Sequence, residues 1–222
     1  EGLHGVIQDS ASGAILCALL TARERATGWK VNAEGMTGSA PLVAYTSEQA
    51  HSATEKGAKI AGFGKANVRL IETDEKFAMR PEALRAAIEQ DRAAGRIPTC
   101  VVASMGTTGV GAVDPLRPIG EICREYDVFF HVDAAWGGSA LILPEERWMA
   151  DGVELVDSFV FNPHKWLMTN FDCSAHYVRD PDALIRTLSI LPEFLKSREQ
   201  SEIIDYRDWS VPLGRRFRAL KL

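Results

Sequence analysis

A regular alternation of short apolar runs and longer helical patterns constrains the fold of this chain more than any other feature. Runs typical of buried strands lie at residues 42–46, 68–71, 99–103, 128–132, 156–161 and 173–178. Patterns typical of helices lie at residues 14–25, 48–61, 81–94, 115–126 and 181–187. Strands that alternate with helices in this way predict right-handed βαβ units. We therefore expect an α/β fold with a mainly parallel sheet.

Length and charge exclude several classes of protein. The 222 residues suffice for one large domain or two small ones, and no stretch reaches the ~20 consecutive apolar residues of a membrane span. The net charge is −5, with acidic and basic residues interleaved, so we expect neither nucleic acid nor membrane among the partners. The nearest approach to a basic cluster, Arg215, Arg216 and Arg218, is short and falls in a helical pattern at residues 213–222.

The four cysteines favour a reducing compartment. Cys17, Cys100, Cys123 and Cys173 lie far apart, mostly within apolar runs, and their spacing suits no metal. We expect reduced thiols in the core of a cytoplasmic protein, and no metal site. The chain has no initiator methionine and no visible signal peptide, and it ends inside a helical pattern, which indicates a piece of a longer protein. Residues 189–206 have weak periodicity and are predicted to form a mobile loop.

A lysine follows the apolar run that ends at Phe161. Asn162 and Pro163 break that strand, because proline removes a backbone donor, and Lys165 comes directly after the break. Ligands of open α/β sheets bind outside the carboxyl ends of the strands, and a desolvated lysine there is a nucleophilic amine. A lone lysine after a strand is more often an ordinary surface residue, so its meaning depends on its neighbours.

Other polar groups follow the strands or begin a helix. Asp133 ends one predicted strand, and Thr107 and Thr108 follow another in a loop rich in glycine and threonine. Ser10 and Ser12 are candidate N-caps of the first helix. The N-terminus of a helix presents free N–H groups and a positive dipole, so it can bind an anion. An amine, a carboxylate, hydroxyls and an anion site are therefore expected at one edge of the sheet.

Each of these features also has an ordinary interpretation. Asp133 alone is better explained as a helix N-cap, and His131 as a plain strand residue. The loop at residues 106–111 is a weak candidate for binding a nucleotide phosphate, because it has no GK[ST] or GxGxxG pattern. His164 is a candidate metal ligand, but no partner lies at metal-ligand spacing.

Taken together, these groups match the needs of pyridoxal phosphate. Its aldehyde requires an amine, its pyridine nitrogen an anion that keeps it protonated, and its phosphate N–H and hydroxyl donors. Small residues after Asp133 would let a flat ring lie close to the backbone, namely Ala134, Ala135, Gly137 and Gly138.

Five segments carry a resemblance to a known family: VIQDSAS, SEQAHSA, HVDAAWGGSALILPE, DSFVFNPHKWLMTNFDCSA and DYRDWSVPLGRRFRALK. The chain resembles the group II pyridoxal-phosphate-dependent decarboxylases, in particular the aromatic-L-amino-acid decarboxylase branch. The resemblance implies an α/β fold of type I, with a mostly parallel seven-stranded sheet flanked by helices, and a homodimer that acts on an amino acid. Family members are about twice as long, so residues 1–222 would be the cofactor-binding large domain, without the N-terminal segment and the C-terminal small domain.

The resemblance also implies roles for individual residues. Lys165 would form the Schiff base, Asp133 would pair with the pyridinium, and His51 would stack on the ring and help to position substrate or deliver a proton. The remaining cofactor contacts would come from Ala11 and Ser12 at the phosphate, helped by Asn162 and His164, with Thr108 near the ring substituents and Ala135 against the ring face.

One position departs from the family pattern. The mobile loop of the family carries a tyrosine thought to protonate the carbanion left by CO₂ loss, and Phe194 stands there in this chain. Phenylalanine has no proton to give, and relatives with phenylalanine resemble aromatic-aldehyde synthases, in which O₂ intercepts the carbanion. The alternatives to an aromatic amine as product are therefore an aldehyde, decarboxylation of a non-aromatic amino acid such as glutamate or histidine, and an inactive fragment.

Overall fold

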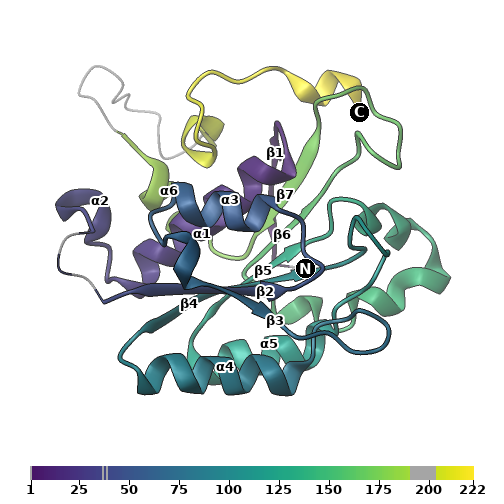
Figure 1. Ribbon diagram of the computed structural model, residues 1–222. Coiled ribbons are helices and arrows are strands. Elements are labelled where there is room, and N and C mark those ends of the chain that lie inside the picture. Colours follow the sequence, from purple (N-terminus) through teal and green to yellow (C-terminus); the bar gives the residue numbers. More distant parts are fainter. Residues whose placement is uncertain (1, 37, 39, 191–203) are drawn as a thin grey trace.

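One seven-stranded sheet organises the chain (Figure 1). The computed structural model describes residues 2–36, 38, 40–190 and 204–222. The strands are β1 (His4–Gln8), β2 (Leu42–Ser47), β3 (Val68–Ile71), β4 (Ile97–Ser104), β5 (Phe129–Asp133), β6 (Ser158–Phe161) and β7 (Ser174–Val178). The α-helices are α1 (Ala11–Ala26), α2 (Val31–Glu34), α3 (Ala53–Ile60), α4 (Pro81–Ala93), α5 (Leu116–Tyr126) and α6 (Pro181–Leu188). The short 3-10 helices are η1 (Lys65–Asn67), η2 (Gly137–Ile142), η3 (Pro144–Ala150), η4 (Val153–Leu155), η6 (Tyr206–Trp209) and η7 (Arg218–Lys221).

The strand order is β1-β7-β6-β5-β4-β2-β3, and β7 alone runs against its neighbours. The pairs β2–β3, β2–β4, β4–β5 and β5–β6 are parallel. A parallel pair needs a crossover connection, whereas residues 162–173 join β6 to β7 without a helix and let the chain turn back. The prediction of a mainly parallel α/β sheet is confirmed, and the reversing connection carries Lys165.

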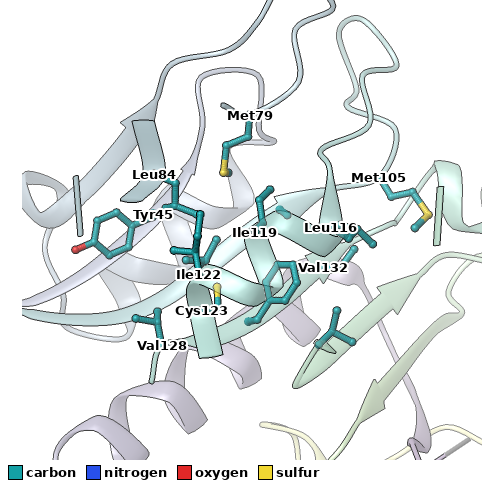
Figure 2. Close-up of a cluster of buried hydrophobic side chains, with 14 of the residues drawn as sticks. Tyr45, Met79, Leu84, Met105, Leu116, Ile119, Ile122, Cys123, Val128 and Val132 are labelled. Carbon is teal, nitrogen blue, oxygen red and sulfur yellow. The ribbon is translucent and has the colours of Figure 1, made fainter. Parts of the chain in front are cut away.

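Helices cover both faces of the sheet, as Figure 1 shows: α4 and α5 lie on one side, and α1, α3 and α6 on the other. Alternation along the strands supplies both cores. Val101 packs with the α4 and α5 residues Leu84 and Ile119, in the cluster drawn in Figure 2. The next residue, Val102, packs on the opposite face with α1 residues such as Leu19. The sheet is therefore buried on both sides.

The structure differs from the sequence-based expectations in three places: at β1, at the start of α3 and at residues 213–222. Strand β1 was not predicted, because its sequence is small and polar; it pairs antiparallel with β7. The helix predicted from residue 48 begins at Ala53, because His51 Nδ1 accepts the Ala53 N–H at 3.1 Å and holds a turn before it.

The predicted helix at residues 213–222 is wrong: among these residues only η7 is helical. Tertiary contacts compete with helix formation there. Arg215 donates to Ser210 Oγ at 2.7 Å and to the Ile7 carbonyl, and Arg218 donates to both Asp172 carboxylate oxygens at 3.1 and 3.2 Å.

Other expectations concern the cysteines, the loop and the membrane. All four cysteines are unpaired and buried, as predicted. Most of the predicted loop at residues 189–206 lies outside the described residues. Among the residues that the structure describes, no helix combines the length and apolar character needed to cross a membrane.

Candidate active site

A cavity of about 210 Å³ lies at the carboxyl ends of β4, β5 and β6, beside the N-terminus of α1. Eight of the ten predicted site residues line it: Ala11, Ser12, His51, Thr108, Asp133, Ala135, Asn162 and Lys165. His164 is outside this lining, and Phe194 falls outside the described residues. The topology thus brings residues far apart in sequence to one place.

The N-terminus of α1 forms one end of the cavity. Ser10, rather than Ser12, is the N-cap: its Oγ accepts the Gly13 N–H at 3.1 Å. The N–H groups of Ala11 and Ser12 precede the first intrahelical bond, which runs from Ala14 N to Ser10 O, and no acidic residue occupies the first turn. This 16-residue helix therefore directs unpaired donors and a positive dipole toward the cavity.

Asp133 provides the carboxylate. Its Oδ1 accepts the Ala135 N–H at 3.0 Å, so the N-cap-like contact expected from the sequence is present. Burial raises the pKa of Asp133, whereas that N–H and the nearby positive charge of Lys165 lower it. No ion pair joins Asp133 to another described residue. A cationic partner such as a protonated ring nitrogen would stabilise this half-buried carboxylate, because burial disfavours an unpaired charge.

Lys165 provides the amine. Its backbone N–H bonds to the Asn162 carbonyl at 3.0 Å, and the Asn162 N–H bonds to the Ala135 carbonyl at 3.1 Å. The buried Asn162 side chain accepts a hydrogen bond from Ser174 Oγ at 2.7 Å. The turn that carries the lysine is therefore fastened to the segment after Asp133. The Lys165 side chain itself is exposed rather than desolvated by the described residues.

His51 lies just before α3 with its side chain exposed. Because Nδ1 accepts the Ala53 N–H, the neutral ring carries its proton on Nε2. Thr108 is also exposed, whereas Thr107 is buried and its Oγ1 accepts the Ala112 N–H at 3.0 Å. The loop at residues 106–111 is thus closed by its own threonine.

His164 does not line the cavity and instead contacts other residues of the connection between β6 and β7. Its Nδ1 accepts the Cys173 N–H at 2.8 Å, and its ring lies 4.7 Å from that of Phe171. Burial and the nearby charge of Lys165 lower the pKa of His164. His131, in turn, lies in the core, where Nδ1 is 2.9 Å from Ser158 Oγ.

The sequence analysis missed the cavity roles of Ser104, Gly106 and Trp136, all of which line it. Gly106 has a φ of 83°, and a Cβ there would meet the Gly137 backbone and the Trp136 ring at 3.0 Å. Of the small residues expected beside a flat ring, Ala135 lines the cavity. Gly137 and Gly138 instead allow close packing against Met105 and Phe161. Ser104 could have been found from the sequence, because it directly follows the predicted strand at residues 99–103 and so reaches the edge of the sheet where ligands bind.

The donor set fits pyridoxal phosphate. The cavity offers an anion-binding helix terminus, a carboxylate and an amine, and neither of the last two forms an ion pair with another described residue. These groups match the phosphate, the ring nitrogen and the aldehyde of the cofactor. Within the described residues, no group of three or more histidine, cysteine or acidic side chains is placed to hold a metal.

Comparisons with known proteins agree with this arrangement. The family model described as "Pyridoxal-dependent decarboxylase conserved domain" matches residues 2–222. The chain is 48% identical over 222 residues to phenylacetaldehyde synthase of Arabidopsis thaliana, covering 98% of the chain and 44% of the relative. It is 49% identical over 224 residues to aromatic-L-amino-acid decarboxylase of Cavia porcellus, covering 98% of the chain and 46% of the relative.

A solved structure of Oryza sativa TDC with PLP and tryptamine superposes with a TM-score of 0.93 at 41% identity, covering 99% of this chain and 45% of that one. The chain thus spans less than half the length of the relatives that it matches. On this evidence the chain belongs to the group II pyridoxal-phosphate-dependent decarboxylases, in their aromatic-amino-acid branch.

Proposed function

We propose that the full-length protein, of which residues 1–222 form the cofactor-binding large domain, converts an aromatic L-amino acid to its amine and CO₂. The observation that carries this proposal is the single cavity that joins the Lys165 amine, the Asp133 carboxylate and the N-terminus of α1. Relatives named for decarboxylation and for aldehyde synthesis match at similar identity, 49% and 48%. These identities do not separate the two products, so the amine product is part of the proposal.

When bound, pyridoxal phosphate supplies an electron-accepting ring that stabilises the charge left as CO₂ departs. Lys165 would hold the aldehyde carbon through Nζ, and Asp133 would keep the proton on the ring nitrogen by presenting a nearby negative charge. Ala11 and Ser12 would bind the phosphate through the first turn of α1. Asn162 would position the lysine turn, to which His164 contributes through Cys173.

The other lining residues would orient substrate and cofactor. In the neutral His51 ring Nε2 carries the proton, so His51 could donate that proton to substrate, and its ring would stack on the cofactor. Ala135 is small enough to let the cofactor ring pack closely against it. The exposed Thr108 hydroxyl would face the ring substituents.

An aldehyde product is the second candidate, and Phe194 favours it. A phenylalanine in place of the loop tyrosine keeps the aromatic ring but offers no proton to the reacting carbon. O₂ would then take the electrons, giving aldehyde, ammonia and peroxide in place of amine.

The deciding experiment supplies the full-length protein with labelled DOPA, tyrosine, tryptophan and phenylalanine, with glutamate and histidine as controls. CO₂, amine, aldehyde and peroxide are measured together. Amine without peroxide supports decarboxylation, and equimolar aldehyde and peroxide support the second candidate. CO₂ from glutamate or histidine alone would refute the aromatic substrate, and no CO₂ from any of them would refute the proposed function.

The lysine assignment has its own test in Lys165→Ala. We expect this variant to lose nearly all turnover. It should also lose the absorbance band, near the edge of the visible range, of the cofactor bound to the lysine. Lys56→Ala is the matched control, because Lys56 is exposed on α3 and does not line the cavity. Retention of both signals by Lys165→Ala would refute the assignment.

We also infer that the full-length protein acts as a homodimer in the cytoplasm. The buried, unpaired state of all four cysteines supports a reducing compartment. Sedimentation of the full-length protein tests the dimer, and fractionation of cells that express it tests the location.

A further inference from the structure

Two half-exposed tryptophans stack beside the cavity. The rings of Trp136 and Trp166 lie 4.6 Å apart between centroids, with their planes 7° from parallel. Trp136 is 41% exposed and Trp166 is 49% exposed. Parallel stacking at this distance removes one face of each indole from water, so the two rings hold each other in place even at the surface.

The stack joins the two segments that carry the reacting groups. Trp136 comes after Asp133 and Ala135 and lines the cavity, and Trp166 directly follows Lys165. Before the lysine, the bond from Asn162 N to Ala135 O makes the same connection at 3.1 Å. Lys165 is thus held between two links to the Asp133 segment, one through a backbone hydrogen bond and one through the stacked rings.

Trp136 also contacts the loop that carries Thr108. A Cβ on Gly106 would lie 3.0 Å from Trp136 Cε3, and one on Gly111 would lie 3.8 Å from Cζ3. The indole therefore packs against the turn after β4 while it stacks on Trp166. A ring with both of these neighbours is better suited to hold the walls of the cavity together than to bind a substrate.

We propose that the stacked pair Trp136–Trp166 is a positioning device that sets the placement of Lys165 relative to Asp133. This proposal rests on the proposed function, since it gives the pair a role in presenting the lysine to the cofactor. The two tryptophans are positioning residues, because they act through Lys165 and its neighbours. Loss of either ring would let the lysine turn move.

The test compares Trp166→Leu with Trp166→Phe in the full-length protein loaded with pyridoxal phosphate. Leucine keeps apolar volume but removes the flat ring, whereas phenylalanine keeps a ring that can stack. We expect the leucine variant to lose at least about 10-fold in kcat with little change in KM, because a misplacement of 1 Å can cost ~100-fold. The phenylalanine variant should recover most of that loss.

A second readout does not depend on activity. Borohydride reduction of the loaded protein fixes the cofactor on the lysine that holds it, and mass spectrometry gives the labelled fraction at Lys165. This fraction should fall in Trp166→Leu and Trp136→Leu, and the double variant should be no worse than either single one, because both substitutions break the same stack. Trp148→Leu is the matched control, since Trp148 is 63% exposed and lies outside the cavity lining.

The outcomes separate this proposal from the one on which it rests. Wild-type labelling and kcat in Trp166→Leu would overturn the positioning role, as would equal losses in the leucine and phenylalanine variants. Failure of the unmodified full-length protein to label at Lys165 would instead overturn the proposed function.

Discussion

The two faces of the sheet are built differently. On the α4 and α5 side, large apolar side chains such as Leu84, Ile119 and Ile122 fill the space between helix and sheet (Figure 2). On the other side, α1 contacts β4, β5, β6 and β7, and its N-terminal half presents small residues such as Ala14 and Ala18 to the sheet.

The α1 side also buries polar groups. Ser158 Oγ lies 2.9 Å from His131 Nδ1 and 2.8 Å from His176 Nε2, and all three residues are buried. Asp133 points to the same side as His131, because the two residues are separated by two positions on β5. Both faces therefore have an apolar core, but the α1 face also brings the end of a helix close enough to the sheet to enclose a polar cavity.

The largest expected effect separates function from stability. Asp133→Ala should cut turnover strongly and weaken cofactor binding, because a neutral pyridine accepts electrons poorly. Stability should change little, since the carboxylate makes one hydrogen bond to a backbone N–H and its burial raises its own pKa. The measurements are kcat, cofactor affinity and the free energy of unfolding of the apoprotein. Unchanged turnover would remove Asp133 from its proposed role.

On the opposite face, Ile119→Ala should mainly affect stability. Ile119 is completely buried in the α4 and α5 cluster, so its truncation leaves a cavity and should cost about 2–5 kcal/mol of unfolding free energy. Denaturant titration of the apoprotein measures this loss. Kinetic constants of the folded fraction should stay near those of the unmodified protein. A loss of kcat as large as that of Asp133→Ala would contradict the division between the two faces.

The close approach of α1 can be tested by adding volume. Ala14 is completely buried and packs with Ala11, Ala135 and Val160. Ala14→Leu should cost about 1–3 kcal/mol, because overpacking moves the helix away from the sheet. The same movement should weaken binding of pyridoxal phosphate at the first turn. Ala87→Leu on α4 is the matched control, since Ala87 is only partly buried beside the other core. Equal effects of both substitutions on cofactor affinity would contradict a role for the close approach of α1 in cofactor binding.

The sequence predicted the elements best where local pattern and tertiary packing agree. The predicted start of α4 is confirmed, because Pro81 occupies the first turn and Leu84 and Ile88 face the core. The strand tips predicted a cluster of Lys165, Asp133 and Thr108, and parallel topology brings them together. Strand β1 was missed, because its sequence is small and polar and its partners on β7 lie 166 to 174 positions away.

Contacts between distant segments explain the other differences. The helix predicted at residues 213–222 does not form as such, since Arg215 and Arg218 bond to Ser210 and Asp172 instead. The stack of Trp136 on Trp166 joins segments 30 positions apart, and no local pattern announces it. The sequence thus predicts which residues reach the edge of the sheet, but not which side chains then hold them there.

The buried histidines on the α1 face are expected to lower the free energy of unfolding of the protein in acid. Burial lowers the pKa of His176 from 6.5 to about 4 and also lowers that of His131. The unfolded chain therefore binds more protons than the folded one as pH falls from 6.5 toward 4, and unfolding free energy should fall with it. One such group contributes at most about 1.4 kcal/mol per pH unit. Asp114 acts in the opposite direction, because burial raises its pKa to about 6.

His176→Gln isolates this contribution. Glutamine keeps a hydrogen-bonding group near Ser158 but does not titrate, so the slope of unfolding free energy against pH between 6.5 and 4 should be smaller in the variant. Asp114 and the other carboxyls are the same in both proteins and cancel in the difference. His4→Gln is the matched control, because His4 is exposed on β1. Parallel slopes for His176→Gln and the unmodified protein would show that His176 carries no acid sensitivity. A reduced slope would instead tie the buried His176 on that face to a measurable loss of unfolding free energy between pH 6.5 and 4.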